Sequence, residues 1–147
     1  MLEGRGEGGA DAWRSRCVVG GRIGHRGFVP SLTSLVGGAT AAYSAAVVVC
    51  PRLLLKPCGL EQSPDTGTLT RAIGARDAAL GLAMIAAPAG PARWGATASR
   101  IAADWSDAAV FGAALAGRGT RGKVVGFAAA WGALSLGAAL LDARRRP

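Results

Sequence analysis

The stretch RIAADWSDAAVF, residues 100–111, decides how this chain must fold, because it places charged side chains in an otherwise apolar, helix-forming segment. The residues Arg100, Asp104, Asp107 and Phe111 follow one another at steps of four, three and four residues. At about 100° per residue they share one helical face, within an arc of about 60°. Arg100 and Asp104 can pair within the helix, whereas Asp104 and Asp107 put two like charges on that face. One of the two carboxyl groups is therefore expected to be protonated unless the fold supplies a further cation.

The preceding apolar segment supplies one. From Ala72 to Ala92 the only charged residues are Arg76 and Asp77. Arg76 is the candidate cation for Asp104 or Asp107, and its guanidinium group has the geometry for bidentate pairing. Asp77 could reach Arg100 or a partner in another subunit.

The sequence thus predicts one buried polar cluster between two helices. Its members are Arg76, Asp77, Arg100, Asp104 and Asp107. A charge at mid-bilayer depth costs about 2.5–3.5 kcal/mol, so these groups are expected to pair rather than face lipid singly. Two arginines and three aspartates give a formal charge of −1, so one aspartate is expected to be protonated or to hold a proton or a cation.

Two uncharged runs flank this pair of polar segments. The run from Gly27 to Pro51 holds 25 residues without a charge, and the run from Val124 to Leu141 holds 18. Helices of that length cross a hydrocarbon core of about 30 Å. A signal peptide is the competing interpretation of the first run, but the residues VVVC at 47–50 do not provide the small residues of a cleavage site.

The expected fold is all-α, a transmembrane four-helix bundle with antiparallel neighbours and a disordered N-terminal tail. Residues 51–70 contain three prolines and two glycines, so we expect a connection there rather than a continuous helix. The predicted parts are a Gly/Arg-rich basic tail (1–27), a membrane domain (28–142) with helices at about 31–50, 70–88, 95–116 and 124–141, and a basic C-terminal tail (143–147). A start codon placed too early is the alternative explanation of residues 1–27.

Small residues predict where the helices pack. Gly74, Ala78 and Gly81 form a small-residue edge on the second predicted helix. Ala129, Ala133 and Gly137 form the equivalent edge on the fourth. Edges of this kind let helix backbones approach closely in lipid.

The positive-inside rule suggests that both termini are cytoplasmic. With both termini on one side, that side carries nine Lys or Arg residues and the other side six. Without residues 1–27 the same count is four against six, which reverses the orientation.

The remaining composition excludes several function classes. The formal charge is +8, but the basic residues gather in tails and loops and form no helix suited to reading DNA, so no nucleic-acid partner is expected. Three cysteines without CxxC spacing and a single histidine, His25, do not provide a zinc site. No phosphate-binding, nucleophile-elbow, metalloprotease or dinucleotide motif is present, so we expect neither a cofactor nor an enzyme.

Part of the chain resembles a known family. The matching pieces are PRLLLKPCG (51–59), RAIGARD (71–77) followed by Gly81, and the pair Asp104 and Asp107. They resemble uncharacterised small four-helix integral membrane proteins that are common in actinobacteria and form a domain of unknown function. The resemblance covers roughly residues 30–142 and implies the fold and the membrane location, but no activity. A looser similarity to DoxX-like membrane proteins exists in architecture alone.

Three functions follow as hypotheses. The first is a structural or interaction subunit of the membrane, held together by the polar cluster and able to form a homo-oligomer or to join another membrane subunit. The second is a small proton-coupled transporter or channel that titrates Asp104 or Asp107. The third is a soluble, Ala-rich helical protein that binds an acidic partner.

Overall fold

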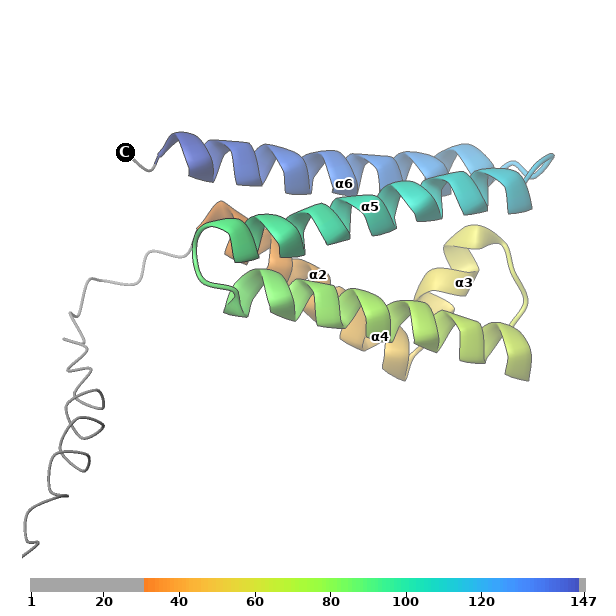
Figure 1. The fold of residues 1–147 in the computed structure, drawn as a ribbon. Coiled ribbons are helices and arrows are strands. Elements are labelled where there is room, and N and C mark those ends of the chain that lie inside the picture. The colour runs from red at the N-terminus through yellow and green to blue at the C-terminus, as the bar shows by residue number, and fades with distance from the viewer. Residues whose placement is uncertain (1–30, 146–147) are drawn as a thin grey trace, which may run out of the picture.

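The computed structural model describes residues 31–145, and this part of the chain forms five helices and no strand (Figure 1). The helices are α2 (Leu32–Val49), α3 (Arg52–Cys58), α4 (Pro64–Ala86), α5 (Pro91–Ala114) and α6 (Arg121–Arg144). The predicted all-α class is therefore confirmed for the described residues. The predicted tail 1–27 lies outside them, as does the end of the predicted C-terminal tail, 146–147.

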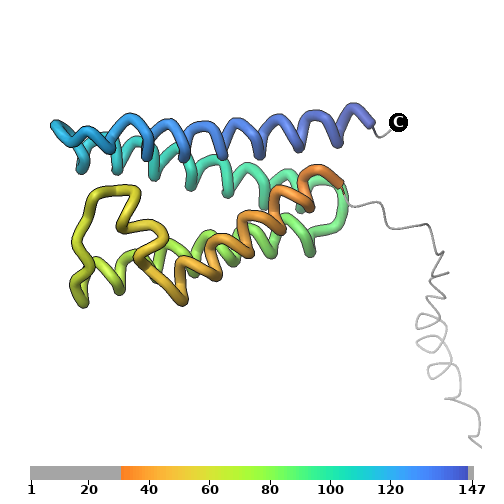
Figure 2. The backbone as a smooth tube through the Cα atoms, turned by 180° about the vertical axis from the view of Figure 1, so that it is seen from behind, coloured from red at the N-terminus to blue at the C-terminus, as the bar shows by residue number. Residues whose placement is uncertain are grey.

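The four long helices alternate in direction and form two pairs. Helix α2 packs mainly against α4, and α5 packs mainly against α6. Helix α2 starts beside the C-terminal end of α6 and then diverges from it, as Figure 2 shows. The short helix α3 lies at the far end, near the turn that joins α5 to α6. Helices α2 and α6 therefore contact each other much less than the two partners within each pair do.

Each long helix turns a seam of small and polar residues towards the others. Buried residues recur at steps of three and four residues, the spacing of one helical face. In α2 they are Thr33, Gly37, Thr40, Ser44 and Val47. In α4 they are Gly67, Thr70, Gly74, Gly81 and Met84. In α5 they are Thr97, Arg100, Asp104 and Gly112.

The backbones of α2 and α4 are in contact at two glycines. A Cβ atom added to Gly81 would lie 2.6 Å from the carbonyl oxygen of Gly37, and one added to Gly37 would lie 2.8 Å from the carbonyl oxygen of Gly81. A Cβ atom on Gly74 would lie 3.0 Å from the carbonyl oxygen of Ser44. Gly74 and Gly81 of the predicted edge therefore lie in the contact between the two helices.

The small-residue edge predicted on the last helix is wrong. Ala133 is exposed, and no atom lies within 4 Å of a Cβ atom added to Gly137. The buried face of α6 is instead formed by Gly132, Ser135, Ala138 and Ala139. At Gly132 an added Cβ atom would lie 2.7 Å from Trp105 Nε1, so α5 packs against that side of α6. An Ala-rich helix offers several equivalent edges, and the neighbours decide which one packs.

The connection between the first two long helices is more structured than expected. Residues 52–58 form α3 with Pro57 in its last turn, and the helix ends at Gly59, whose φ is 66°. Helix α4 begins at Pro64 rather than near residue 70. Ser63 and Thr66 form a capping box in front of it, and Pro64 occupies the first helical turn, where proline is favourable.

Two of the described helices, α2 and α6, are long and apolar enough to cross a membrane. Most of their apolar windows face outwards, because only 28% of the window in α2 and 22% of that in α6 is buried within the protein. Helices α4 and α5 do not meet the same test, because each carries several charged residues. Any membrane insertion of α4 and α5 must therefore depend on how those charges are neutralised.

Candidate functional site

The five charged residues predicted to form a cluster lie together between α4 and α5. They form a chain of ion pairs in which the sign of the charge alternates. The order along the chain is Asp104, Arg100, Asp77, Arg76 and Asp107. Each arginine lies between two aspartates, and an aspartate stands at both ends. We call this arrangement the ion chain.

The inner end of the ion chain is a bidentate pair on α5. Arg100 Nε donates a hydrogen bond of 3.0 Å to Asp104 Oδ2, and Arg100 Nη2 donates to Asp104 Oδ1. Both side chains are almost fully buried, with 6% and 4% of their surface exposed. Since the two residues are four positions apart, the helix itself holds this pair in register.

Asp77 connects the inner pair to α4. Its Oδ2 lies 2.9 Å from Arg100 Nη1, and its Oδ1 accepts a hydrogen bond of 2.9 Å from Arg76 Nε. One carboxylate thus bridges two guanidinium groups that come from different helices. Asp77 can do so because it falls between Gly74 and Gly81 on the buried seam of α4.

The outer end of the ion chain joins α4 back to α5. Arg76 Nη2 donates a hydrogen bond of 2.5 Å to Asp107 Oδ2. The side chain of Arg76 is 41% exposed and that of Asp107 is 18% exposed. The prediction that the whole cluster is buried is therefore wrong at this end. Arg76 follows Ala75 off the buried seam, about 100° from Asp77, so it starts on the outer surface and reaches inwards.

One donor in the ion chain lacks a hydrogen bond. Among the buried polar side-chain atoms of the described residues, Arg100 Nη1 has no hydrogen-bonded partner. It lies near Asp77 Oδ2, so the contact is an ion pair without hydrogen-bond geometry. A buried donor left in this way is costly, and a water molecule or a ligand would reduce the cost.

The ion chain forms part of the wall of a cavity of about 480 Å³ between the two helix pairs. Asp77, Arg100, Asp104 and Asp107 line it, and the rest of the wall is mostly apolar, with residues from all five described helices. A volume of this size falls within the range of about 300–1,000 Å³ that is typical of small-molecule pockets.

Aromatic side chains form the wall of the cavity contributed by α2 and α6. The ring centroids of Tyr43 and Phe127 are 6.5 Å apart, and those of Phe127 and Trp131 are 5.8 Å apart with nearly parallel planes. Trp131 Nε1 donates a hydrogen bond of 2.9 Å to Thr40 Oγ1 across the two helices. The indole is thereby fixed in orientation. Nothing in the sequence around Trp131 indicates that this residue stands beside a cavity.

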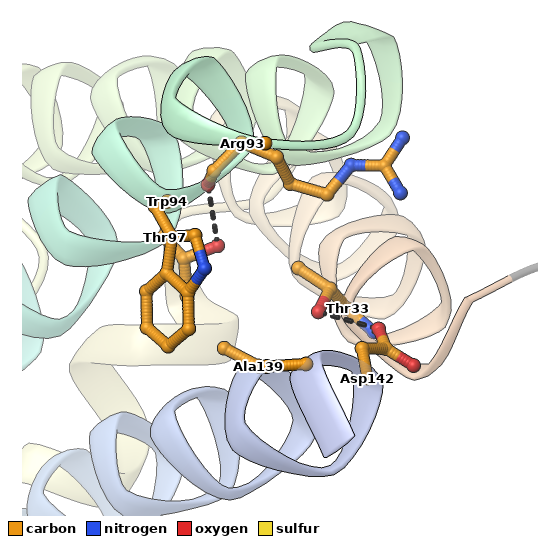
Figure 3. A pocket seen from close by; sticks show the side chains of 8 residues that line it. Thr33, Arg93, Trp94, Thr97, Ala139 and Asp142 are labelled. Atoms are coloured by element: carbon orange, nitrogen blue, oxygen red, sulfur yellow. Dashed lines mark hydrogen bonds between the residues drawn. The ribbon is translucent and has the colours of Figure 1, made fainter. Parts of the chain in front are cut away.

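The opposite end of the bundle is closed by residues that the sequence did not single out. Asp142 Oδ2 accepts hydrogen bonds from the backbone N–H of Thr33 (2.8 Å) and from its hydroxyl (2.7 Å), and Asp142 Oδ1 accepts one from Leu32 N (3.1 Å). Figure 3 shows the carboxylate of α6 at the start of α2. Arg93 closes the adjoining side by donating to Ala87 O and Ser31 Oγ.

A second cavity lies at this closed end and is too small for an organic ligand. It is lined by Thr33, Trp94, Thr97 and Asp142, among others, as Figure 3 shows. Its volume of about 30 Å³ corresponds to about one water molecule. We therefore regard the end around Asp142 as a structural closure, and the larger cavity beside the ion chain as the candidate site.

Within residues 31–145, no group of three or more His, Cys, Asp and Glu residues is arranged to hold a metal ion. The three aspartates of the ion chain instead face arginines. Cys50 and Cys58 are both free thiols.

Comparisons with protein-family models, with curated proteins and with solved structures found no match. The resemblance to the four-helix actinobacterial family therefore stays a prediction.

Proposed function

We propose that this chain is a small multi-pass protein of the cell membrane that crosses the bilayer with α2, α4, α5 and α6 and holds a small molecule in the cavity between its two helix pairs. The role is binding or transport, without catalysis. Both termini are cytoplasmic in this proposal, as the basic residues of the whole chain suggest.

The observation that carries the membrane location is the distribution of polar and apolar side chains. Among the described residues, large apolar side chains cover the outside, including Leu35, Val49, Leu69, Leu82 and Val110, each more than half exposed. The buried positions include, beside a few large apolar residues such as Met84 and Leu115, four threonines, two serines, an arginine and an aspartate. In water such a chain would expose its apolar surface and desolvate its polar groups, which is unfavourable in both respects. In lipid the same distribution is favourable, and this argues against the soluble alternative.

The ion chain explains how α4 and α5 enter lipid. A single charged residue at mid-bilayer depth costs about 2.5–3.5 kcal/mol, and neither helix is apolar enough to offset several of them. Paired across the α4–α5 contact, the charges neutralise one another except for one excess negative charge. Helices α4 and α5 therefore insert together, as a hairpin joined by residues 87–90, rather than one after the other.

The cavity favours a ligand over a purely structural role. Ion pairs that only hold helices together work best in a tightly packed contact, because a void removes the dispersion contacts of its lining. Here the ion chain lies at the wall of a cavity of about 480 Å³. A structural or interaction subunit is the second candidate, and the exposed apolar face of α6 favours it, because a second copy of the chain could cover that face as well as lipid does.

The test of the membrane location is extraction of cell membranes that contain the full-length chain. We expect the protein to stay in the pellet after washes with sodium carbonate at high pH and to enter the supernatant only with detergent. Release by the carbonate wash would show a peripheral or soluble protein and would overturn the proposal. A cytoplasmic enzyme and a known multi-pass protein of the same cells serve as controls.

A further inference from the structure

We propose that the cavity binds a lipophilic organic cation, whose positive charge lies between Asp104 and Asp107 and whose apolar body rests against the aromatic wall. The inference rests on the proposed function, because it names the chemical class of the molecule that the cavity holds.

The ion chain lacks one positive charge. Its three carboxylates face two guanidinium groups, and both of its ends are acidic. The two end residues, Asp104 and Asp107, are three positions apart on α5 and both line the cavity. One cationic group placed between them would turn the open chain into a closed ring of alternating charges. It would also balance the formal charge of the site.

The arginines do not make the site suitable for an anion. Of the two, only Arg100 lines the cavity, and it already contacts both Asp77 and Asp104. An anion near it would face the three carboxylates of the ion chain at close range. Arg100 Nη1, the donor without a hydrogen bond, is itself buried and lies 2.9 Å from Asp77 Oδ2, so it offers no open position for an anion.

The size and the lining of the cavity distinguish an organic cation from a proton or a metal ion. A bare ion needs a few oxygen ligands and no cavity of about 480 Å³. The rings of Tyr43, Phe127 and Trp131 stand beside the same space as the carboxylates. Aromatic faces attract cations through the ring quadrupole and also bury apolar groups, so together with a carboxylate they suit an amine, a quaternary ammonium or a phosphonium ion.

The test is binding of tetraphenylphosphonium to the purified full-length protein in detergent, measured by equilibrium dialysis against a detergent blank. We expect saturable binding that Asp107→Asn weakens about tenfold, because it removes one of the two charges around the cation. Phe127→Ala is expected to weaken binding about fivefold through the lost aromatic face. The matched controls are Asp65→Asn on α4 and Leu134→Ala on α6, both exposed and away from the cavity, and both are expected to bind as the wild type does.

Triphenylphosphine oxide is a neutral molecule of similar shape. It distinguishes a cavity that binds organic molecules in general from a cavity that selects cations. Stronger binding of the neutral probe than of the cation would overturn the assignment of charge and leave a ligand cavity in place. Binding of neither probe to monodisperse, helical protein would overturn the inference, whereas the membrane location would still be decided by carbonate extraction. Cation binding that Asp107→Asn and Phe127→Ala both leave unchanged would place the probe elsewhere and would also overturn it.

Discussion

Arg76 Nη2 on α4 lies 2.5 Å from Asp107 Oδ2 on α5, and this contact ties the two helix pairs together at the outer edge of the ion chain. The inner contact, between Asp77 and Arg100, joins the same two helices at 2.9 Å. The pairs α2–α4 and α5–α6 are each internally well packed, but α4 and α5 touch each other much less. The ion chain therefore carries much of the contact between α4 and α5, while α2 and α6 form the other contact between the pairs.

The coupling between Arg76 and Asp107 can be measured by a double-mutant cycle with Arg76→Ala and Asp107→Ala. We expect each single change to lower the free energy of unfolding and the double change to cost less than their sum, with a coupling energy of about 1 kcal/mol. The value is modest because Arg76 is 41% exposed. Unfolding in mixed detergent micelles, followed by circular dichroism, gives the free energies.

The control for this cycle pairs Arg71→Ala with Asp107→Ala. Arg71 is also an exposed arginine of α4, but it donates to the carbonyl oxygen of Val48 rather than to the ion chain. The two changes should be additive within about 0.5 kcal/mol. Additivity in the Arg76 cycle as well would show that the contact between Arg76 and Asp107 contributes nothing to stability.

The members of the ion chain could be found from the sequence, but their burial could not. Charges in an apolar run must find partners, and the spacing of Arg100, Asp104 and Asp107 placed them on one helical face. Arg76 and Asp77 are adjacent, so only one of them can lie on the buried seam. Choosing between them needs the position of α2, which is set by Gly81 and not by the charges themselves.

Gly81→Ala tests the close contact of α2 with α4. The added Cβ atom would lie 2.6 Å from the carbonyl oxygen of Gly37 and 2.7 Å from the backbone nitrogen of Ala41, both of which are backbone atoms that cannot rotate away. The helices must therefore separate, and we expect a loss of about 1–3 kcal/mol of stability. The thermal midpoint in detergent should fall accordingly.

Gly137→Ala is the matched control, because it makes the same substitution within a helix where no atom lies within 4 Å of the new Cβ atom. It should be neutral or slightly stabilising, since alanine is the better helix former. Equal midpoints for the two variants would contradict the close packing of α2 and α4.

Asp142→Ala should loosen the start of α2. The aspartate caps this helix from α6, and its removal leaves the N–H groups of Leu32 and Thr33 and the hydroxyl of Thr33 without their acceptor. We expect a loss of about 1–2 kcal/mol, comparable to the loss of an N-cap. Hydrogen exchange should become faster in the first turn of α2 and stay unchanged in α3. Asp142→Asn, which keeps one acceptor oxygen, should have a smaller effect, and equal exchange in all three proteins would show that the cap is dispensable.

The hydrogen bonds by which Asp142 caps α2 could not be predicted from the sequence. Asp142 directly follows the uncharged run that ends at Leu141, and nothing in the residues around it indicates a partner. Its partners in α2 are about 110 residues away, and no local pattern connects them. The start of α4, by contrast, can be predicted from the sequence, because Ser63, Pro64 and Thr66 form a recognisable helix start that the prolines at 51 and 57 do not affect.

Single cysteines in the two tight turns test whether α5 crosses the membrane. Ala89, in the α4–α5 turn, and Gly119, in the α5–α6 turn, are both exposed and lie at opposite ends of α5. In a background with Cys17, Cys50 and Cys58 changed to serine, we expect a membrane-impermeant maleimide to label Gly119→Cys from outside the cell. Ala89→Cys should be labelled only after permeabilisation, because in the proposed topology it shares the cytoplasmic side with the two termini. The reverse pattern would keep the four crossings and invert the orientation, as the basic residues predict when residues 1–27 are left out of the count. Labelling of both positions from the same side would mean that α5 does not span the bilayer, and the ion chain would then face water instead of neutralising two helices in lipid.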